Sequence, residues 1–271
     1  MAALAPARAA DTIAATRLHV GDASRPPDLS KVRAFVDRVA PAVDRVAIAV
    51  GVPGVEERTL EALGELAAGV RAACAGAAAP VDVVPVEPWG NFLPALNALT
   101  AHAARRGYGF ILFASVEAAA DPATARRLRA ELDAADALVA GAALPGHDFS
   151  PGERPLTGVT TPWNTLALWR VPSLALLGFP LVGEGLHAGA AGGVEEVSAI
   201  HALAKVHPAK ARALLVALPG VAWATDFDDE KRAAWHAKKM ASKESRPAAH
   251  LALLAAEAGP PTTVLHVVAS P

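Results

Sequence analysis

The chain has very few of the residues that form disulfides, zinc sites and membrane spans. Its one cysteine, Cys74, excludes an intramolecular disulfide and a thiolate-rich zinc site. No run approaches the roughly 18 apolar residues that a spanning helix needs. The opening residues, MAALAPARAADT, lack the continuous apolar segment of a signal peptide. These absences predict a soluble, cytoplasmic protein without a transmembrane segment.

Aromatic residues and net charge are both low. Aromatics make up 5% of the 271 residues although 53% are hydrophobic, because alanine supplies much of the apolar count. This composition favours helices packed closely on a sheet. The net charge is −2, from 25 basic and 27 acidic side chains, so neither nucleic acid nor an anionic membrane is indicated as a partner.

The phosphate-binding and hydrolase motifs of common α/β enzymes are missing. There is no G-x-G-x-x-G after the first predicted strand and no Walker lysine loop, which argues against dinucleotide oxidoreductases and P-loop enzymes. No G-x-S-x-G elbow is present, so an α/β-hydrolase is not indicated. The scattered histidines match no structural zinc spacing.

The residues up to 117 alternate between strand and helix signals. Apolar runs predict strands at 12–20, 46–50, 81–86 and 110–114, and amphipathic segments between them predict helices. This alternation is typical of an α/β fold with a doubly wound, mostly parallel sheet flanked by helices.

The second half of the chain has a more elaborate pattern. Asp121 and Pro122 begin a predicted helix that ends near Ala135, and residues 137–143 and 221–225 predict further strands. Residues 145–180 are rich in Gly, Pro, Thr and Trp and are interpreted as loops and short strands over the ends of the sheet. Further helices are predicted from near residue 194, over 228–245, and from after Pro247 to 257. We expect a single domain over residues 1–271.

Polar candidate residues begin at Asn97, and most follow predicted strands or open predicted helices. Ligands of open α/β sheets bind beyond the carboxyl ends of the strands, so Ser115 and Glu117, which follow strand 110–114, are the first candidates. The others are His147, Asp148, Trp163, Asn164, Glu195, Glu196, His236, Lys239, Lys243 and Arg246.

Four segments occur in a characteristic order. Ala95-Leu96-Asn97 lies in the helix before strand 110–114, Ser115-Val116-Glu117 follows that strand, and Leu177-Gly178-Phe179 and Glu195-Glu196 come later. This order resembles the GT-A glycosyltransferases of the nucleotide-diphospho-sugar transferase superfamily, most of all the family-2-like members. The family has an Ala-Leu-Asn-x-Gly helix, a strand ending in an acidic DxD motif, then a further strand, a Gly-Phe corner and an acidic pair opening a helix. Residues 164–169 stand where the further strand would be. The resemblance covers roughly residues 12–206, and the ordered series carries it because no single motif is specific.

The resemblance implies a GT-A-like domain with a nucleotide-binding half at 12–117 and an acceptor and diphosphate half at 118–271. It implies an inverting transfer of a sugar from a nucleotide-diphosphate donor to a hydroxyl acceptor. Glu196, with Glu195 as second choice, would be the catalytic base. The implied donor contacts are Asn97, Ser115, Glu117, Lys239, Lys243 and Arg246, and the implied sugar or acceptor contacts are Trp163, Asn164, His147 and Asp148.

Two departures from the family pattern leave the chemistry open. The DxD motif binds a divalent cation, Mn²⁺ or Mg²⁺, and Ser115 stands where its first Asp would be. Such a cation takes several oxygen ligands, and Glu117 alone supplies few of them. His236 would be a further ligand of the site. The alternative is metal-free neutralisation of the diphosphate by Lys239, Lys243 and Arg246, which share one face of a predicted helix. The second departure is Glu196, where the family usually has Asp.

Other interpretations stay open beside this one. The chain could be a binding or scaffold protein that keeps the fold without the chemistry, or a sugar nucleotidyltransferase, for which residues 21–27 form a poor version of the required loop. Each candidate also has a structural interpretation: Asn97 ties loops together, His147 braces a loop, Trp163 is a core aromatic, and Glu195 and Glu196 stabilise a helix start.

Overall fold

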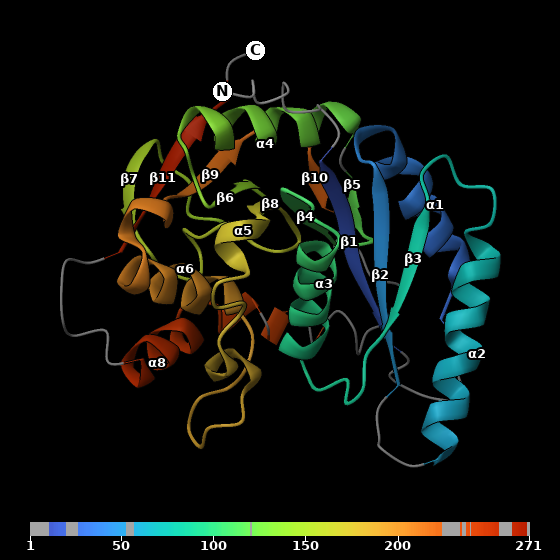
Figure 1. Cartoon of the computed structure of the whole chain (residues 1–271). Coiled ribbons are helices and arrows are strands. Elements are labelled where there is room, and N and C mark those ends of the chain that lie inside the picture. Colours follow the sequence, from blue (N-terminus) through green and yellow to red (C-terminus); the bar gives the residue numbers. More distant parts are fainter. Residues whose placement is uncertain are drawn as a thin grey trace, which may run out of the picture.

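One mixed sheet organises the molecule in this computed structural model. The structure describes residues 11–19, 27–52, 57–119, 121–223, 234, 237–238, 240–254 and 262–269. Within them, nine strands pair in the order β3-β2-β1-β4-β8-β6-β9-β11-β7. Figure 1 shows this sheet running from β3 on the right to β7 on the left. The predicted fold class, an α/β protein with a mostly parallel sheet flanked by helices, is confirmed.

The first four strands form the predicted parallel half of the sheet. They are β1 (Thr12–His19), β2 (Arg45–Gly51), β3 (Val81–Pro85) and β4 (Phe110–Ala114). Strand β1 pairs in parallel with both β2 and β4, and β2 pairs with β3. The chain therefore winds outward from β1 to β3 and then crosses back to place β4 on the other side of β1. The junction of β1 and β4 is the topological switch point, where open α/β sheets bind their ligands.

The second half of the chain extends the same sheet. Strands β6 (Val139–Ala142), β9 (Ala213–Ala217) and β11 (Thr263–Val268) pair in parallel, and β7 (Gly152–Pro155) runs antiparallel to β11. Strand β8 (Leu166–Arg170) lies antiparallel between β4 and β6. The interpretation of 145–180 as segments over the ends of the sheet is therefore wrong for β8, which is buried in its middle. The predictions also did not include β9 and β11.

Helices cover both faces of the sheet. They are α1 (Leu29–Val39), α2 (Glu57–Ala73), α3 (Leu93–Arg105), α4 (Pro122–Ala134), α5 (Val171–Leu174), α6 (Glu195–Val206) and α8 (Ser245–Leu253), with 3-10 turns η1 (Ala40–Ala42), η2 (Leu181–Glu184) and η3 (Pro208–Lys210). The predicted cap of α4 is confirmed, since Asp121 accepts a hydrogen bond from the Thr124 N–H at 2.7 Å. None of the described helices combines the length and apolar character that crossing a bilayer requires.

The C-terminal helical region differs from its prediction. Much of the helix predicted over 228–245 lies outside the described residues. In the described part, a turn at 242–244 precedes α8, which begins at Ser245 and contains Arg246 and Pro247 in its first turn. The predicted helix start after Pro247 is therefore too late.

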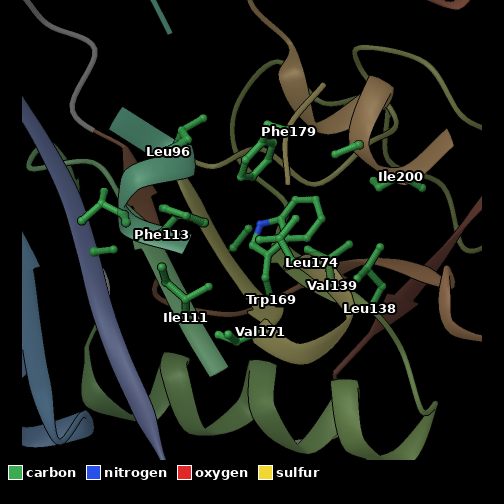
Figure 2. Packing of buried hydrophobic residues seen from close by; sticks show 14 of the residues in the cluster. Leu96, Ile111, Phe113, Leu138, Val139, Trp169, Val171, Leu174, Phe179 and Ile200 are labelled. Carbon is green, nitrogen blue, oxygen red and sulfur yellow. The ribbon is translucent and has the colours of Figure 1, made fainter. Parts of the chain in front are cut away.

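Alternate residues of each strand divide between two buried clusters, one on each face of the sheet. In β4, Ile111 and Phe113 pack with α3, α5 and α6, while Phe110 and Leu112 pack with α1, α2 and α4. Figure 2 shows the first cluster, where Trp169 and Phe113 both lie near Phe179. The ring centroids of Phe179 and Trp169 are 5.4 Å apart in an edge-to-face arrangement. This cluster forms a rigid support for the ends of β4 and β8.

A small second sheet follows β4 directly. Strand β5 (Ala118–Ala119) pairs antiparallel with β10 (Ala222–Trp223). Strand β10 lies within the strand predicted at 221–225, of which 224 and 225 are outside the described residues. Its pairing brings Trp223 close to the turn that carries Glu117. Segments from both halves of the chain therefore meet at the end of β4.

Candidate functional site

A cleft with a volume of about 730 Å³ lies at the carboxyl ends of β1 and β4, at the switch point of the sheet. Its polar lining side chains come from several separate segments: Thr16, Arg17, Asp28, Lys31, Asn91, Ser115, Glu117, Asn164, Thr165, Glu195, Glu196 and Lys243. The volume is in the range of about 300–1,000 Å³ that small-molecule sites occupy. Seven of the predicted site residues thus line the cleft: Ser115, Glu117, Trp163, Asn164, Glu195, Glu196 and Lys243.

The two carboxylates that the sequence analysis placed at the centre of the site lie in this one cleft. Glu117 is in the turn after β4, where its carboxylate accepts a hydrogen bond from the Ser115 hydroxyl. Glu196 is in the first turn of α6. Both line the cleft, although their elements are far apart in the chain.

Glu196 is a buried carboxylate with a perturbed acidity. It is 5% exposed, and its Oε1 accepts a hydrogen bond from the Asn164 backbone N–H at 2.5 Å. Burial, and then the charge of Glu195, raise the pKa of Glu196 to about 7, against the opposing effects of Lys243 and the Asn164 hydrogen bond. A carboxylate with a pKa near neutrality is suited to accept a proton from a bound hydroxyl.

The residue before this acid pair has a strained backbone. Val194 has φ 59° and ψ 41°, a left-handed conformation that is a genuine outlier for a β-branched residue. Its side chain is 4% exposed and packs into the cluster with α3 and α6. Backbone strain of this kind persists where the surrounding packing enforces it, often at functional sites. Here it fixes the direction in which α6 starts, and so the position of Glu195 and Glu196.

Arg17 is a cleft residue that the sequence analysis did not single out. Its Nη1 donates to the Phe92 carbonyl at 2.9 Å, and its Nη2 lies 4.0 Å from Glu195 Oε1. About a third of its side chain, 31%, is exposed. The available sequence signal was its place near the carboxyl end of the first strand, where a charged side chain interrupts an apolar run.

Phe92, the partner of Arg17, is held by a buried acid. The Glu184 carboxylate accepts hydrogen bonds from the N–H groups of Asn91, Phe92 and Leu93, the last two at 3.0 and 2.7 Å. Glu184 is 3% exposed, and it satisfies N–H groups at the start of α3, where Phe92 offers no side-chain cap. Nothing local in the sequence indicates this cap, because Glu184 comes from the distant turn η2.

Trp163 and Lys243 pack against each other in the wall of the cleft. The Lys243 Nζ lies 3.1 Å from the centroid of the Trp163 ring, and the His147 ring stacks on Trp163 with a centroid separation of 3.6 Å. The indole N–H donates to the Gly158 carbonyl at 2.7 Å. With 1% of its surface exposed, the ring has no open face, so the predicted stacking on a sugar does not fit this arrangement.

Asn164 connects the cleft to the core beneath it. Its Oδ1 accepts a hydrogen bond from the Trp169 indole at 2.8 Å, and its backbone N–H binds Glu196. Its buried Nδ2 has no hydrogen-bond partner among the described residues. The predicted contact between Asn164 and a sugar hydroxyl stays a prediction.

Four predicted site residues in the described part of the chain do not line the cleft: Arg246, which is treated below, and Asn97, His147 and Asp148. Asn97 binds the backbone of Phe179 through both ends of its amide, with its Oδ1 accepting at 2.8 Å and its Nδ2 donating at 3.0 Å. His147 bonds to the backbones of Leu144 and Thr161, and Asp148 is outside the lining. Asn97 and His147 therefore make the loop-bracing contacts of the structural interpretation, and the donor and acceptor contacts of these two residues and of Asp148 stay predictions. Burial lowers the pKa of His147 to about 3, so its ring is neutral near pH 7.

The predicted basic helix face is not formed by Lys243 and Arg246. Lys243 lies in the turn at 242–244 and lines the cleft, whereas Arg246 lies in α8 and does not line it. Arg246 is 8% exposed, and its Nη1 donates to the Gly192 carbonyl at 2.7 Å. It supports the glycine segment before α6. The other two candidates of this region, His236 and Lys239, lie outside the described residues.

The described donor set does not fit a divalent cation. Around Glu117 the cleft offers the hydroxyl of Ser115, which is already hydrogen-bonded to the Glu117 carboxylate. No group of three or more His, Cys, Asp or Glu side chains that could hold a metal occurs among the described residues. Mg²⁺ and similar hard cations take several oxygen ligands. Of the two predicted metal ligands, only the Glu117 carboxylate lies in the described part of the chain, because His236 is outside it.

Among known proteins, the chain is similar only to solved structures, through its fold. No protein-family model and no curated protein matches the chain. Residues 1–349 of S. aureus TarS are similar at 12% identity, covering 70% of this chain and 54% of that one, with a TM-score of 0.40. The chain thus spans about half the length of that solved structure.

Two further solved structures have similar values. Mannose-1-phosphate geranyltransferase from Thermus thermophilus is 18% identical, covering 70% of this chain and 67% of that one, with a TM-score of 0.40. Core-mannan synthase A from Aspergillus fumigatus is 8% identical, covering 62% and 61%, with a TM-score of 0.33. Identities and TM-scores this low establish neither a family nor an activity for the chain.

Proposed function

We propose that the protein is an inverting glycosyltransferase, which moves a sugar from a nucleotide-diphosphate donor to a hydroxyl acceptor. The observation that carries this proposal is the buried carboxylate of Glu196 in the wall of the switch-point cleft that also contains Glu117. The ordered segments that resemble GT-A glycosyltransferases contribute Ser115, Glu117, Glu195 and Glu196 to this same cleft.

Glu196 acts as the general base of the reaction. Its carboxylate takes the proton of the acceptor hydroxyl as the hydroxyl oxygen attacks the anomeric carbon of the donor sugar. The bond from that carbon to the donor phosphate oxygen breaks, and the electron pair leaves with the nucleoside diphosphate. A single direct displacement inverts the configuration at the anomeric carbon.

The remaining cleft residues orient the two substrates. Glu117, braced by Ser115, lies at the end of β4 beside the switch point and accepts hydrogen bonds from donor hydroxyl groups. Asn164 fixes Glu196 through its backbone and offers its amide to a sugar hydroxyl. Trp163 positions Lys243.

Binding and product analysis test this proposal together. UDP-GlcNAc, UDP and GDP are suitable first probes, because solved TarS was obtained with UDP and UDP-GlcNAc and the mannan synthase as an Mn/GDP form. Calorimetric titration with and without Mn²⁺ measures binding. Incubation of nucleotide sugars with a panel of hydroxyl acceptors, followed by NMR, gives the anomeric configuration of the product.

The expected result is nucleotide-sugar binding and a product of inverted configuration. Glu196→Gln should keep binding and lose turnover, whereas the matched control Glu61→Gln, an exposed position on α2, should behave like the parent. Nucleotide binding without turnover on any acceptor would favour the inactive scaffold. Release of pyrophosphate would instead identify a sugar nucleotidyltransferase.

A further inference from the structure

The cleft contains basic side chains on several of its walls. Arg17 comes from β1, Lys31 from α1, and Lys243 from the turn before α8. They are accompanied by four carboxylates among the described lining residues, those of Asp28, Glu117, Glu195 and Glu196. A polyanionic ligand can enter such a site only if these positive groups face it or a bound cation offsets the carboxylates.

Arg17 is placed to bind phosphate beside the acid pair. Its anchor to the Phe92 carbonyl, at 2.9 Å, fixes one edge of the guanidinium, and the group lies 4.0 Å from Glu195. A guanidinium carries five N–H donors and matches phosphate oxygens in a bidentate geometry. Its partial exposure in the cleft wall leaves it accessible to a ligand.

Lys243 is the second fixed positive group. It is 6% exposed and held over the Trp163 ring at 3.1 Å, and its charge acts on Glu196. An ammonium in this position is largely desolvated, which strengthens its attraction to an anion. Arg17 therefore lies near one carboxylate of the Glu195-Glu196 pair, and Lys243 acts on the other.

We infer that Arg17 and Lys243 bind the diphosphate of a nucleoside diphosphate donor in place of a divalent cation. This inference rests on the proposed function, and it follows from the disagreement between the described donor set and a metal site. The Ser115 hydroxyl and the Glu117 carboxylate bind each other, and no cluster of metal-ligating side chains accompanies them in the described part of the chain.

The two positive groups act on the leaving group during transfer. As the bond between the anomeric carbon and the phosphate oxygen breaks, both electrons of that bond pass to the oxygen, and the diphosphate gains negative charge. The guanidinium of Arg17 and the ammonium of Lys243 stabilise that charge without giving up a proton. The proton of the acceptor hydroxyl passes to Glu196, so charge and atoms balance across the step.

Titration of UDP and of GDP into the full chain tests the inference, with the protein in EDTA and, separately, in Mn²⁺ or Mg²⁺. Binding should persist in EDTA. Arg17→Gln and Lys243→Gln should each weaken it about 10-fold or more, because each loses a charge-assisted hydrogen bond. Arg126→Gln, an exposed arginine on α4 away from the cleft, is the matched control and should bind like the parent.

Two charge-conserving variants separate binding from folding. Arg17→Lys and Lys243→Arg keep the positive charge and should recover binding in part, and thermal melting of every variant verifies that it is folded. Binding that requires Mn²⁺ or Mg²⁺, or that is unchanged in both glutamine variants, would overturn this inference and leave the proposed function intact. If neither nucleotide binds under any condition, both proposals fail.

Discussion

The backbone N–H of Asn164 binds the carboxylate of Glu196 at 2.5 Å and joins the segment before β8 to the first turn of α6. The orientation of the acid is therefore set in part by a main-chain N–H group. Because β8 is fixed between β4 and β6, the acid is tied to the rigid centre of the sheet. A carboxylate held in this way loses little entropy when substrate binds.

The pH dependence of turnover should report Glu196. Its raised pKa of about 7 means that the basic form is lost as the pH falls through neutrality. We expect kcat/KM to fall about tenfold per pH unit below roughly pH 6.5 and to level off above roughly pH 8. A pH–rate profile measures this. A profile that is flat from pH 5 to 8 would show that another group, or none, acts as the base.

The stability of the fold should also depend on Glu196, and it should fall as the pH rises, whereas turnover should increase. The pKa of Glu196 is raised in the folded state, so the folded state binds more protons between about pH 4.5 and 7, and the group's contribution to stability declines as the pH rises through that window. Glu196→Gln keeps the acceptor for Asn164 and removes the buried charge. We expect it to be more stable than the parent at pH 8 by at most about 3 kcal/mol, with little difference at pH 4.5. Urea unfolding at both pH values measures the effect, and equal differences at the two would contradict it.

Removing the charge of Glu117 should weaken donor binding. Glu117→Gln retains the shape of the side chain but makes a weaker acceptor for the Ser115 hydroxyl and for ligand hydroxyls. We expect a loss of about tenfold in nucleotide-sugar affinity, of the size of one charged hydrogen bond. Calorimetry with UDP-sugars and GDP-sugars measures it, with Glu131→Gln on α4 as control. Unchanged affinity would remove Glu117 from the site.

Loss of the Glu184 carboxylate should destabilise the protein. Glu184→Ala leaves the N–H groups of Asn91, Phe92 and Leu93 without their acceptor at the start of α3. We expect the free energy of unfolding to fall by about 2–4 kcal/mol, since the buried N–H of Leu93 and two less buried N–H groups lose their acceptor. The exposed position Glu65→Ala on α2 is the control. A change of less than about 0.5 kcal/mol would mean that water replaces the carboxylate at little cost.

The sequence predicted the first half of the fold well, because its strands are apolar runs separated by amphipathic helices. The end of the fourth predicted strand indicated Glu117, and the resemblance to GT-A glycosyltransferases implied Glu196; both residues line the cleft. The sequence prediction failed for β9 and for the position of β8. The run at 213–217 is short and apolar in an alanine-rich chain, so periodicity cannot separate a buried strand from a helix there. The antiparallel position of β8 depends on pairing with β4 and β6, which is not a local property.

The cleft contacts that were missed depend on partners distant in the chain. Arg17 is fixed by Phe92, and Phe92 by Glu184, and each step joins segments that have no periodic relation in the sequence. In contrast, the sequence offered a loop-bracing role for Asn97, and its hydrogen bonds to the Phe179 backbone agree with that role. Sequence patterns therefore indicated residues that line one cleft but not the contacts that hold its walls.

The position of β11 has a consequence for synthesis. This strand, at 263–268, separates β9 from β7 in the sheet, so neither can acquire its neighbour on that side before those residues leave the ribosome. Until then the nascent chain presents an uncovered strand edge, to which other polypeptides can add. We expect a chain shortened before residue 263 to aggregate in cells unless a chaperone shields that edge.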